Sequence, residues 1–554
     1  GSGVTGRAII LASTPDGVHN TSQIKFYSMK AGTAQHAVTI NSEGGINETG
    51  GVLKENLLTN SGFDVWSHST LVEATSGAAP VLDGANSALT NNLITNGGFD
   101  SATTGWSSAV GAGSAATLAS VGSGKTGNCL RVTAASGTAT GASTSFTCVI
   151  GKLYQVTYHY NRGDIAALSS AIGTAAYPSL GYGSIHGYGE VPGETETDTD
   201  FSEAVTYVFE ATATTHYLTI FGTMGATQVM YIDSVTAYEV TPGITNPTGN
   251  CLCFDGWSAG TSHAGLDFFR QENIDVGHAS NKTNSKLGSF YALKIQFTRD
   301  SSVFSGAVWP GPLQHTTAGS GSVDPVHLEK FRGKTVTLGC WVKSSTTGKG
   351  GIAIDDADTV TTVVTTGTSW EWLEVTDTIG DTSASFDIHL LSSPIADGSY
   401  ITYFSQPMLV FGSSIGEGNY TRPQGEIVYF EKKVASNYLN GNTGMSDEDA
   451  TLNTEADSNG AVPKGAKGLF VLTNCGDSGS AGSSATDTWF TMRADGNADW
   501  IYYNVPQGKA DDKRHIKTAW QPCNADGDVT YGVYASGSGT FDVVQFEYKG
   551  VQLR

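Results

Sequence analysis

Tyrosines alternate with glycines in one stretch of the chain, YPSLGYGSIHGYGE. It carries aromatic rings and polar side chains at Tyr177, Tyr182, His186, Tyr188 and Glu190. Aromatic faces accept the C–H bonds of a sugar ring, while short polar side chains bond its hydroxyls. Because glycines keep a loop adaptable, the pattern is typical of a binding loop. We expect a glycan contact here; the alternatives are an ordinary tyrosine-bearing loop and a contact between subunits.

A second aromatic candidate stands in the stretch AVWPGPLQH, where Trp309 lies in a loop ahead of an expected strand. An indole in such a loop offers a flat face on which a sugar can stack. Three other tryptophans, Trp106, Trp370 and Trp372, are expected to pack in cores or interfaces, because the last two fall on one face of a strand.

Catalytic motifs are mostly missing. The segment CGDSGS around Ser478 lacks a matching histidine segment upstream, and no helix is expected after Gly412-x-Ser414-x-Gly416. The sequence contains no HExxH, P-loop or Rossmann pattern. We therefore expect no enzyme. Because 52 acidic residues leave room for a pair of distant carboxylates, a glycan-degrading enzyme stays an alternative.

The elements that position these residues are expected to be strands. The chain has 554 residues, of which 70 are glycine and only 15% are charged. Apolar and polar residues alternate throughout: in TVTLGCWV, Val336, Leu338, Cys340 and Val342 share one face. Half-buried antiparallel strands show this period of two. The sequence therefore predicts an all-β protein made of several antiparallel β-sandwiches of the jelly-roll type.

Charge and cysteine content exclude several classes of protein. The net charge of −22 repels phosphate backbones, so we expect no nucleic-acid partner. No stretch approaches the ~20 apolar residues of a membrane helix, so we expect no membrane insertion. The seven cysteines are too few for a disulfide framework and are expected to be small buried hydrophobes. Pairing of Cys129 with Cys148, or of Cys475 with Cys523, is the alternative.

An internal repeat sets the domain organisation. NLLTNSGFD at 56–64 recurs 36 positions later as NLITNGGFD at 92–100. Since a β-sandwich needs about 100 residues, the first copy has no room for its own body before the second begins. We infer a domain nested inside a host. The expected parts are a β stalk or attachment element at 1–50, a host jelly roll at 51–90 and 245–425, an inserted jelly roll at 91–242, and a C-terminal β-sandwich at 426–554.

Inside the C-terminal part, the stretch NGNTGMSDEDATLNTEADSNG is polar and acidic. Such a composition is typical of a solvated connection. We expect an exposed loop over residues 440–460.

Several motifs resemble known families. NLITNGGFDSATTGW, NCLRVTA and YIDSVTAYEV resemble the carbohydrate-binding-module type of galactose-binding-like jelly roll. NLLTNSGFDVWS, FDGWSAG, FRGKTVTLGCWVKSS and NYTRPQGEIVYFEKK are similar, in this order, to bacteriophage tail-fibre and other virion proteins. The resemblance covers most of the chain. It implies a virion appendage, usually trimeric, that binds a host surface.

The first resemblance also implies a structural Ca²⁺ between the opening motif and the last strand. Asp100 and Asp233 match the family's positions, with Asn96 nearby. Ca²⁺ takes six to eight oxygen ligands, so backbone carbonyls must complete the shell. In the host, Ser405 and Gln406 stand where the aspartate would be expected, which argues against a second calcium there.

These resemblances lead to one expected function. The chain is expected to be a non-enzymatic phage tail-fibre or receptor-binding protein, a homotrimer in an extracellular virion that is assembled in the host cytoplasm. Its expected partners are host-surface glycans and other virion proteins. Two further alternatives are a structural virion protein (head fibre, decoration or neck) without glycan binding, and a bacterial surface or secreted carbohydrate-binding adhesin.

Overall fold

The structure of the chain is a computed structural model. It describes residues 9–13, 23–30, 33–40, 46–48, 55–73, 92–113, 115–135, 137–165, 168–176, 184–186, 199–245, 254–259, 266–272, 291–299, 312–315, 328–356, 360–392, 398–423, 425–435, 439–445, 448–476, 488–494, 501–504, 514–535 and 541–553.

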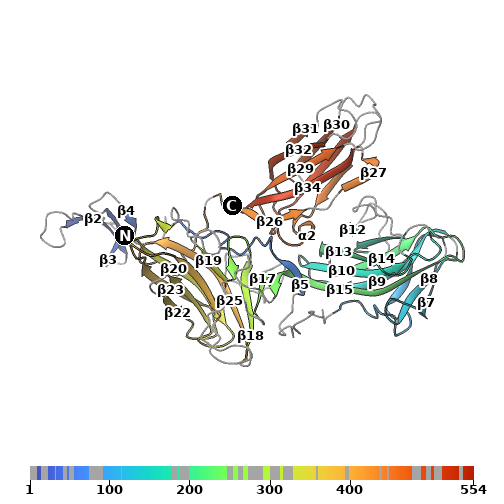
Figure 1. The fold of residues 1–554 in the computed structure, drawn as a ribbon, viewed down its shortest axis with the longest axis horizontal. Coiled ribbons are helices and arrows are strands. Elements are labelled where there is room, and N and C mark those ends of the chain that lie inside the picture. The colour runs from blue at the N-terminus through green and yellow to red at the C-terminus, as the bar shows by residue number, and fades with distance from the viewer. Residues whose placement is uncertain are drawn as a thin grey trace, which may run out of the picture. The chain divides into compact units, whose positions relative to one another are not determined.

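The described residues form an all-β protein, as predicted (Figure 1). One short helix, α2 (Thr454–Asp457), interrupts the strands. None of the described helical segments is long and apolar enough to cross a membrane. The chain divides into two compact units, of which the first holds residues 1–64, 245–273 and 280–426 and the second residues 65–244, 274–279 and 427–554.

The first unit contains a small sheet and a sandwich. The small antiparallel sheet has the order β1 (Ile9–Ser13), β2 (Gln23–Lys30), β3 (Thr33–Ile40), β4 (Ile46–Glu48). One sheet of the sandwich runs β17 (Leu266–Glu272), β18 (Tyr291–Arg299), β25 (Gly398–Phe411), β20 (Thr335–Ser344), β23 (Glu371–Thr378). The other runs β16 (Ser258–Ala259), β19 (Pro312–His315), β24 (Asp387–Ser392), β21 (Gly350–Asp355), β22 (Val360–Val364).

The second unit contains two sandwiches, of which the first is built from strands within the range predicted to be the inserted jelly roll. One of its sheets runs β13 (Ala204–Glu210), β10 (Leu153–Asn161), β15 (Val229–Thr245), to which β8 (Asn128–Thr133) and β7 (Thr117–Gly122) are added. The other runs β12 (Ser184–His186), β11 (Leu168–Gly173), β14 (Thr215–Gly222), β9 (Gly137–Thr147), β6 (Trp106–Gly113). Strand β5 (Thr70–Glu73), which the sequence boundaries assign to the host, pairs with β15.

The C-terminal sandwich completes the second unit. Its first sheet runs β26 (Ile427–Ala435), β34 (Phe541–Gln552), β29 (Gly468–Gly476), β32 (Arg514–Pro522), and β27 (Leu439–Met445) also pairs with β34. Its second sheet runs β28 (Glu448–Leu452), β33 (Val529–Ala535), β30 (Thr488–Ala494), β31 (Ile501–Asn504).

The alternation read from the sequence gives the inward faces. In β20, Val336, Leu338, Cys340 and Val342 are all fully buried, and the same holds for every second residue from Tyr154 in β10. Burying such a face removes apolar surface from water at roughly 25 cal/mol per Å², which stabilises the sandwich.

The cysteines behave largely as expected. Cys129, Cys148 and Cys340 are buried and unpaired, and Cys523 is half-buried and unpaired. Burial raises the pKa of the Cys129 thiol to about 11 and that of Cys148 to about 12. Neither of the two pairings considered from the sequence is therefore made through Cys129, Cys148 or Cys523.

One local prediction was wrong. The stretch 440–460, expected to be an exposed loop, contributes β27, β28 and α2. Thr454 and Glu455 are almost fully buried. The polar side chains are used for capping: Asn453 caps α2 by accepting the Ala456 N–H, and the Thr454 hydroxyl donates to the Gly527 carbonyl. Hydrogen bonds inside the fold thus replace the water contacts that the composition suggested.

Candidate functional site

Each copy of the repeat opens with an asparagine that clamps the last strand of a sandwich. The Asn56 amide donates to the Pro407 carbonyl at 3.0 Å and accepts the Leu409 N–H at 3.1 Å. Asn92 bonds the Val235 carbonyl and the Ala237 N–H in the same way, at 3.1 and 2.9 Å. The two asparagines, 36 positions apart, therefore make equivalent hydrogen bonds to a last strand.

The backbone repeats as well. Asn60 and Asn96 have φ of +50° and +56°, and Phe63 and Phe99 have φ of +58° and +59°. In the last strands, Gln406 and Ser234 are also left-handed, at +57° and +53°.

These correspondences equate Asp64 of the host with Asp100 of the inserted domain. Ser405 directly precedes Gln406, and Asp233 directly precedes Ser234, so Ser405 corresponds to Asp233. The two sandwiches can therefore be compared residue by residue at this point.

The first copy is bonded to chain segments far from it in sequence. The Leu57 N–H donates to the Leu409 carbonyl at 2.9 Å, and the Trp257 indole donates to the Thr59 carbonyl at 3.1 Å. These bonds join the first copy to residues near 257 and 409, and the discontinuous host domain stays a prediction.

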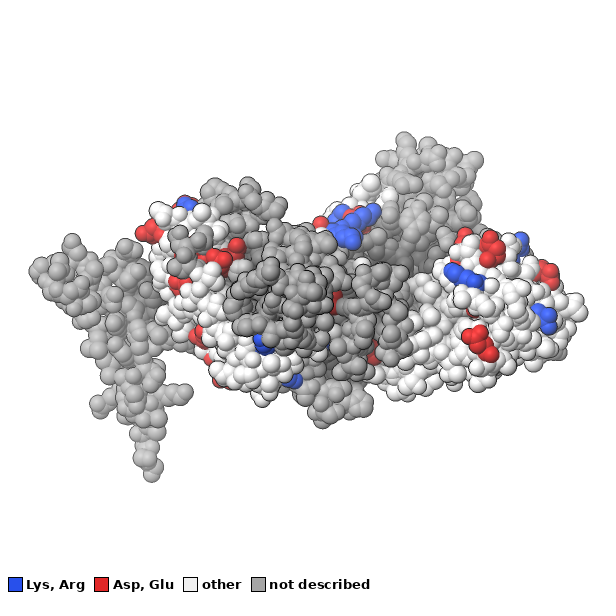
Figure 2. Space-filling model, turned by 60° about the horizontal axis from the view of Figure 1, so that its bottom comes forward, with Lys and Arg blue, Asp and Glu red and all other residues white. Residues whose placement is uncertain are grey.

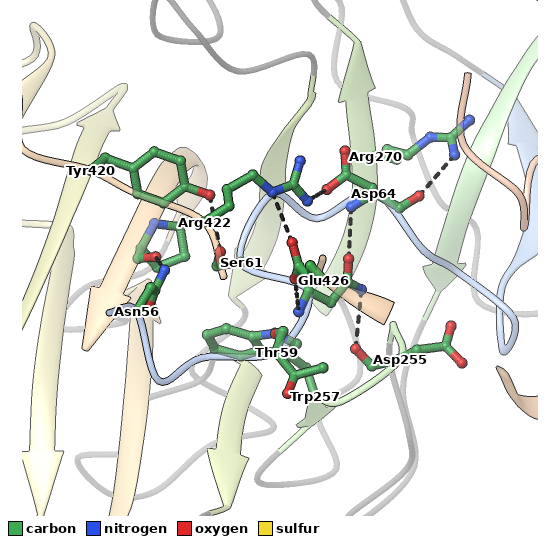
Figure 3. Close-up of polar contacts among 12 residues, drawn as sticks. Asn56, Thr59, Ser61, Asp64, Asp255, Trp257, Arg270, Tyr420, Arg422 and Glu426 are labelled. Atoms are coloured by element: carbon green, nitrogen blue, oxygen red, sulfur yellow. Dashed lines mark hydrogen bonds and ion pairs between the residues drawn. The ribbon is translucent and has the colours of Figure 1, made fainter. Parts of the chain in front are cut away.

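In the host, a half-buried arginine bonds two buried carboxylates (Figure 3). The Arg422 guanidinium bonds the Asp64 carboxylate through Nη2 and the Glu426 carboxylate through Nε. Those carboxylates are only 7% and 3% exposed. Glu426 also accepts the Asn60 N–H at 3.0 Å. Because a buried charge is costly without a partner, Arg422 is what allows both carboxylates to be buried.

The protonation states around Arg422 follow from burial. Burial raises the pKa of Glu426, and the nearby Arg422 charge opposes that shift. Burial also raises the pKa of Tyr420, so its hydroxyl stays protonated and shares a hydrogen bond with Ser61 at 3.0 Å. Each group is committed to a neighbour, which indicates a structural network rather than a catalytic pair.

In the inserted domain the corresponding carboxylate has no such arginine. Asp233 is fully buried, and it accepts the Thr126 N–H at 3.0 Å and the Ser234 N–H at 2.6 Å. Among the described residues, no side-chain cation is paired with Asp233. The neighbouring Lys125 instead has its ammonium within hydrogen-bond distance of the His159 ring nitrogens.

Asp100, which is exposed, borders the same turn. One carboxylate oxygen lies 3.7 Å from where a Cβ on Gly127 would stand. Asp100 and Asp233 thus flank one turn, residues 124–127. Asn96 is used differently, since its side-chain amide bonds backbone atoms of residues 101–104.

A second feature of the inserted domain is the outward face of the sheet β12-β11-β14-β9-β6. On β14, Leu218 and Ile220 point into the core, so Tyr217, Thr219 and Phe221 share the outward face. Tyr217 and Phe221 are four residues apart, which is about 13 Å along a strand. The Tyr217 ring at one end of this row is half-buried, whereas Phe221 at the other end is only 7% exposed.

Between the two rings, small side chains cover this face of the sheet. Thr219 is in register with Ser143 on β9 and Ala171 on β11, and Ser143 with Ser107 on β6. The Ser143 and Thr219 hydroxyls bond each other at 3.0 Å, whereas Ser107 remains exposed. Because Thr219 and Ser143 are buried, the groups that this face offers to a carbohydrate are the Tyr217 ring, for stacking, and exposed serine hydroxyls such as that of Ser107.

Most of the aromatic candidates from the sequence lie outside the described residues: Tyr177, Tyr182, Tyr188 and Trp309. His186 belongs to β12, whose backbone pairs with β11 at the edge of this sheet. Tyr182 and Tyr188 are each two positions from an end of β12 in the sequence.

Sequence reasoning missed Tyr217, Phe221 and Arg422 as site residues. Tyr217 and Phe221 lie in an alternating stretch, HYLTIFG, that shows which residues share a face but not which face is outward. Arg422 lies far from Asp64 in sequence, and no motif joins them.

No family model matches the sequence, and no curated protein matches it. Solved structures give weak likenesses. A tandem pair of family 22 carbohydrate-binding modules from Paenibacillus barcinonensis Xyn10C is 14% identical, with a TM-score of 0.26, and 60% of this chain covers all of that one.

Two other likenesses are weaker still. The module TmCBM61, solved with β-1,4-galactotriose, is 12% identical with a TM-score of 0.20, over 27% of this chain and 99% of its own. A triple jelly-roll turret protein of an archaeal virus is 8% identical with a TM-score of 0.14, over 80% and 90%. At these values the likenesses assign neither a ligand nor an activity to this chain.

Proposed function

We propose that this chain is a non-enzymatic attachment protein that binds host-surface glycans through the outward β14 face of its inserted jelly roll. The carrying observation is Tyr217, a half-buried ring on that face that is in register with the exposed Ser145 on β9. The Tyr217 hydroxyl has no hydrogen-bond partner among the described residues, so it is available to a sugar hydroxyl.

The finer proposal is a phage tail fibre or receptor-binding protein. It rests on the resemblance of the host-domain motifs to virion proteins. Shallow sugar sites bind weakly one at a time, but several linked copies raise avidity by ~10²–10⁴ where geometry allows simultaneous contact. A virion appendage with repeated copies of this chain would use that effect.

We also propose that a structural Ca²⁺ supports this domain. The fit is argued from Asp233, a fully buried carboxylate that lacks a cationic partner among the described residues. Each carboxylate oxygen accepts one N–H and can accept a further ligand. Asp100 and Asp233 would hold the ion, with backbone carbonyls completing an oxygen shell. A bound cation would offset the cost of burying this charge.

The test uses the full chain on a glycan array drawn from bacterial surface polysaccharides. Wild type should bind a defined set of glycans, and Tyr217→Ala should weaken that binding at least tenfold. Tyr217→Phe should keep most of the stacking. The matched control is Tyr231→Ala, a half-buried tyrosine on the opposite sheet, which should bind like wild type.

Three results would count against the proposal. Absence of binding to every glycan, with tight binding to another virion protein, would favour a structural virion role. Release of reducing sugars from a host polysaccharide would favour an enzyme. Equal loss of binding in Tyr217→Ala and in the control would remove the β14 face as the site.

A further inference from the structure

The C-terminal sandwich carries a row of aromatic rings on the outward face of the sheet β26-β34-β29-β32. Tyr429 is in register with Gly550, Gly550 with Phe470, and Phe470 with Trp520. The core side of these strands is set by the neighbouring residues Val428, Leu469 and Val551, which are buried.

The rings form one continuous platform. The centroids of Tyr429 and Phe470 are 5.6 Å apart, and those of Phe470 and Trp520 are 5.2 Å apart. Tyr429 is 63% exposed, far more than an aromatic side chain in a core. The two outer rings therefore lie about 11 Å apart at most, which is long enough for about two sugar units.

Two glycines make room for the rings. A Cβ on Gly468 would stand 2.0 Å from the Trp520 ring, so that ring lies directly over Gly468. A Cβ on Gly550 would stand 3.2 Å from the Tyr429 ring. A ring that rests on the backbone keeps its other face toward solvent, which is the geometry that stacking on a sugar requires.

The polar groups at the platform are unused. Among the described residues neither the Tyr429 hydroxyl nor the Trp520 indole N–H has a hydrogen-bond partner. A purely apolar partner would leave both groups desolvated without a bond, at a cost of about 1–3 kcal/mol each. A sugar offers hydroxyls to both.

Charge favours a neutral sugar. On the same sheet, Lys433 and Lys549 both bridge the Glu547 carboxylate, which leaves this cluster one net positive charge. The chain as a whole carries −22, which disfavours anionic polymers. In the view of Figure 2, uncharged side chains make up most of the described surface.

Size argues against a second copy of the chain as the occupant. A stable interface buries roughly 800 Å² per partner. Three partly exposed aromatic side chains of about 150–250 Å² each fall short of that area. A sugar chain needs only the rings themselves.

We propose that Tyr429, Phe470 and Trp520 form a second glycan-binding site, specific for neutral oligosaccharides and separate from the β14 face. This site does not depend on the function proposed above. It would give each chain two contacts for carbohydrate.

The experiment measures binding of neutral tetrasaccharides (cello-, xylo-, manno- and malto-) to the full chain by isothermal titration calorimetry. At least one tetrasaccharide should bind to wild type. Tyr429→Ala and Trp520→Ala should each weaken its affinity tenfold or more, whereas Tyr429→Phe should retain most of the affinity. Ile516→Ala is the control, because Ile516 is 62% exposed on the same strand as Trp520 but outside the row. If Trp520→Ala fails to fold, Tyr429→Ala decides alone.

The Tyr217→Ala variant separates the two proposals. Binding that is lost in Tyr429→Ala but kept in Tyr217→Ala supports the second site even if the β14 face fails. Absence of binding by all four sugars, or loss only in Tyr217→Ala, overturns the second site. Self-association in sedimentation that disappears in Tyr429→Ala, without any sugar effect, overturns it in favour of a second copy.

Discussion

At the residue scale, a single guanidinium group distinguishes the two nested jelly rolls. In the host, Arg422 lies between the buried carboxylates of Asp64 and Glu426. In the inserted domain, the buried Asp233 accepts two N–H groups and has no cationic side chain as partner among the described residues. The opening motif therefore has an arginine at the host carboxylate, and the Ca²⁺ that we propose would take the corresponding role in the other copy.

Replacing Arg422 by leucine should destabilise the host strongly. Two buried carboxylates would lose their cation, which costs about 3–5 kcal/mol when one partner of a buried pair is removed. Differential scanning calorimetry should show one transition moving to lower temperature. Lys330→Leu removes an exposed cation that has no ion-pair partner among the described residues, and it should leave that transition in place. Equal behaviour of the two variants would refute the structural role of Arg422.

Removal of calcium should destabilise the inserted domain. Ligand at 100 times its Kd stabilises by about 2.7 kcal/mol, so EDTA should lower one Tm by about 5–10 °C. Asp233→Asn should abolish the response to EDTA, whereas Asp164→Asn, an exposed aspartate of the same domain, should retain it. An unchanged wild-type melting curve in EDTA would rule the ion out.

At the element scale, the asparagine clamps tie each opening segment to a last strand. Removing the Asn56 amide leaves the Leu409 N–H and the Pro407 carbonyl without their partner, at a cost of about 1–3 kcal/mol for each buried group. Asn56→Ala should therefore speed hydrogen exchange in peptides covering 407–411.

The second clamp supplies the matched control for the first. Asn92→Ala should speed hydrogen exchange in peptides covering 235–240 and leave 407–411 protected. If Asn56→Ala instead exposed only peptides next to residue 56, the discontinuous host would be contradicted.

The sequence predicted strands and faces better than it predicted sites. Alternation identified the buried face of β10, because a period of two reports directly on one face of a sheet, whereas in β20 Thr337 and Trp341 on the other face are buried as well. The repeat pointed to a nested domain because its spacing left no room for a sandwich. Arg422 and the row of Tyr429, Phe470 and Trp520 depend on strands that meet only after folding, so no local pattern reveals them.

The predicted loop at 440–460 shows where composition gave the wrong structure. Its acidic and polar residues look solvated in one dimension, but Thr454 and Asn453 bond the backbone of a folded turn. Composition alone cannot distinguish a polar side chain that caps a helix from one that faces water.

At the scale of the whole molecule, we expect three chains to associate. Exposed sheet edges invite pairing, and a threefold axis is one way to cover them. Sedimentation equilibrium at several concentrations should give the mass of three chains of 57.8 kDa each. A single-chain mass at every concentration would contradict the homotrimer and would remove the avidity expected from linked sites.

The inserted jelly roll begins and ends at the same place. Leu93, at its start, donates its N–H to the carbonyl of Ala237, near its end, at 2.9 Å. A module with adjoining ends behaves as a cassette: one sandwich can be exchanged for another of different preference while the flanking chain keeps its course. If this sandwich binds glycans as we propose, its glycan preference can change by exchange of this piece alone, while the rest of the chain stays the same.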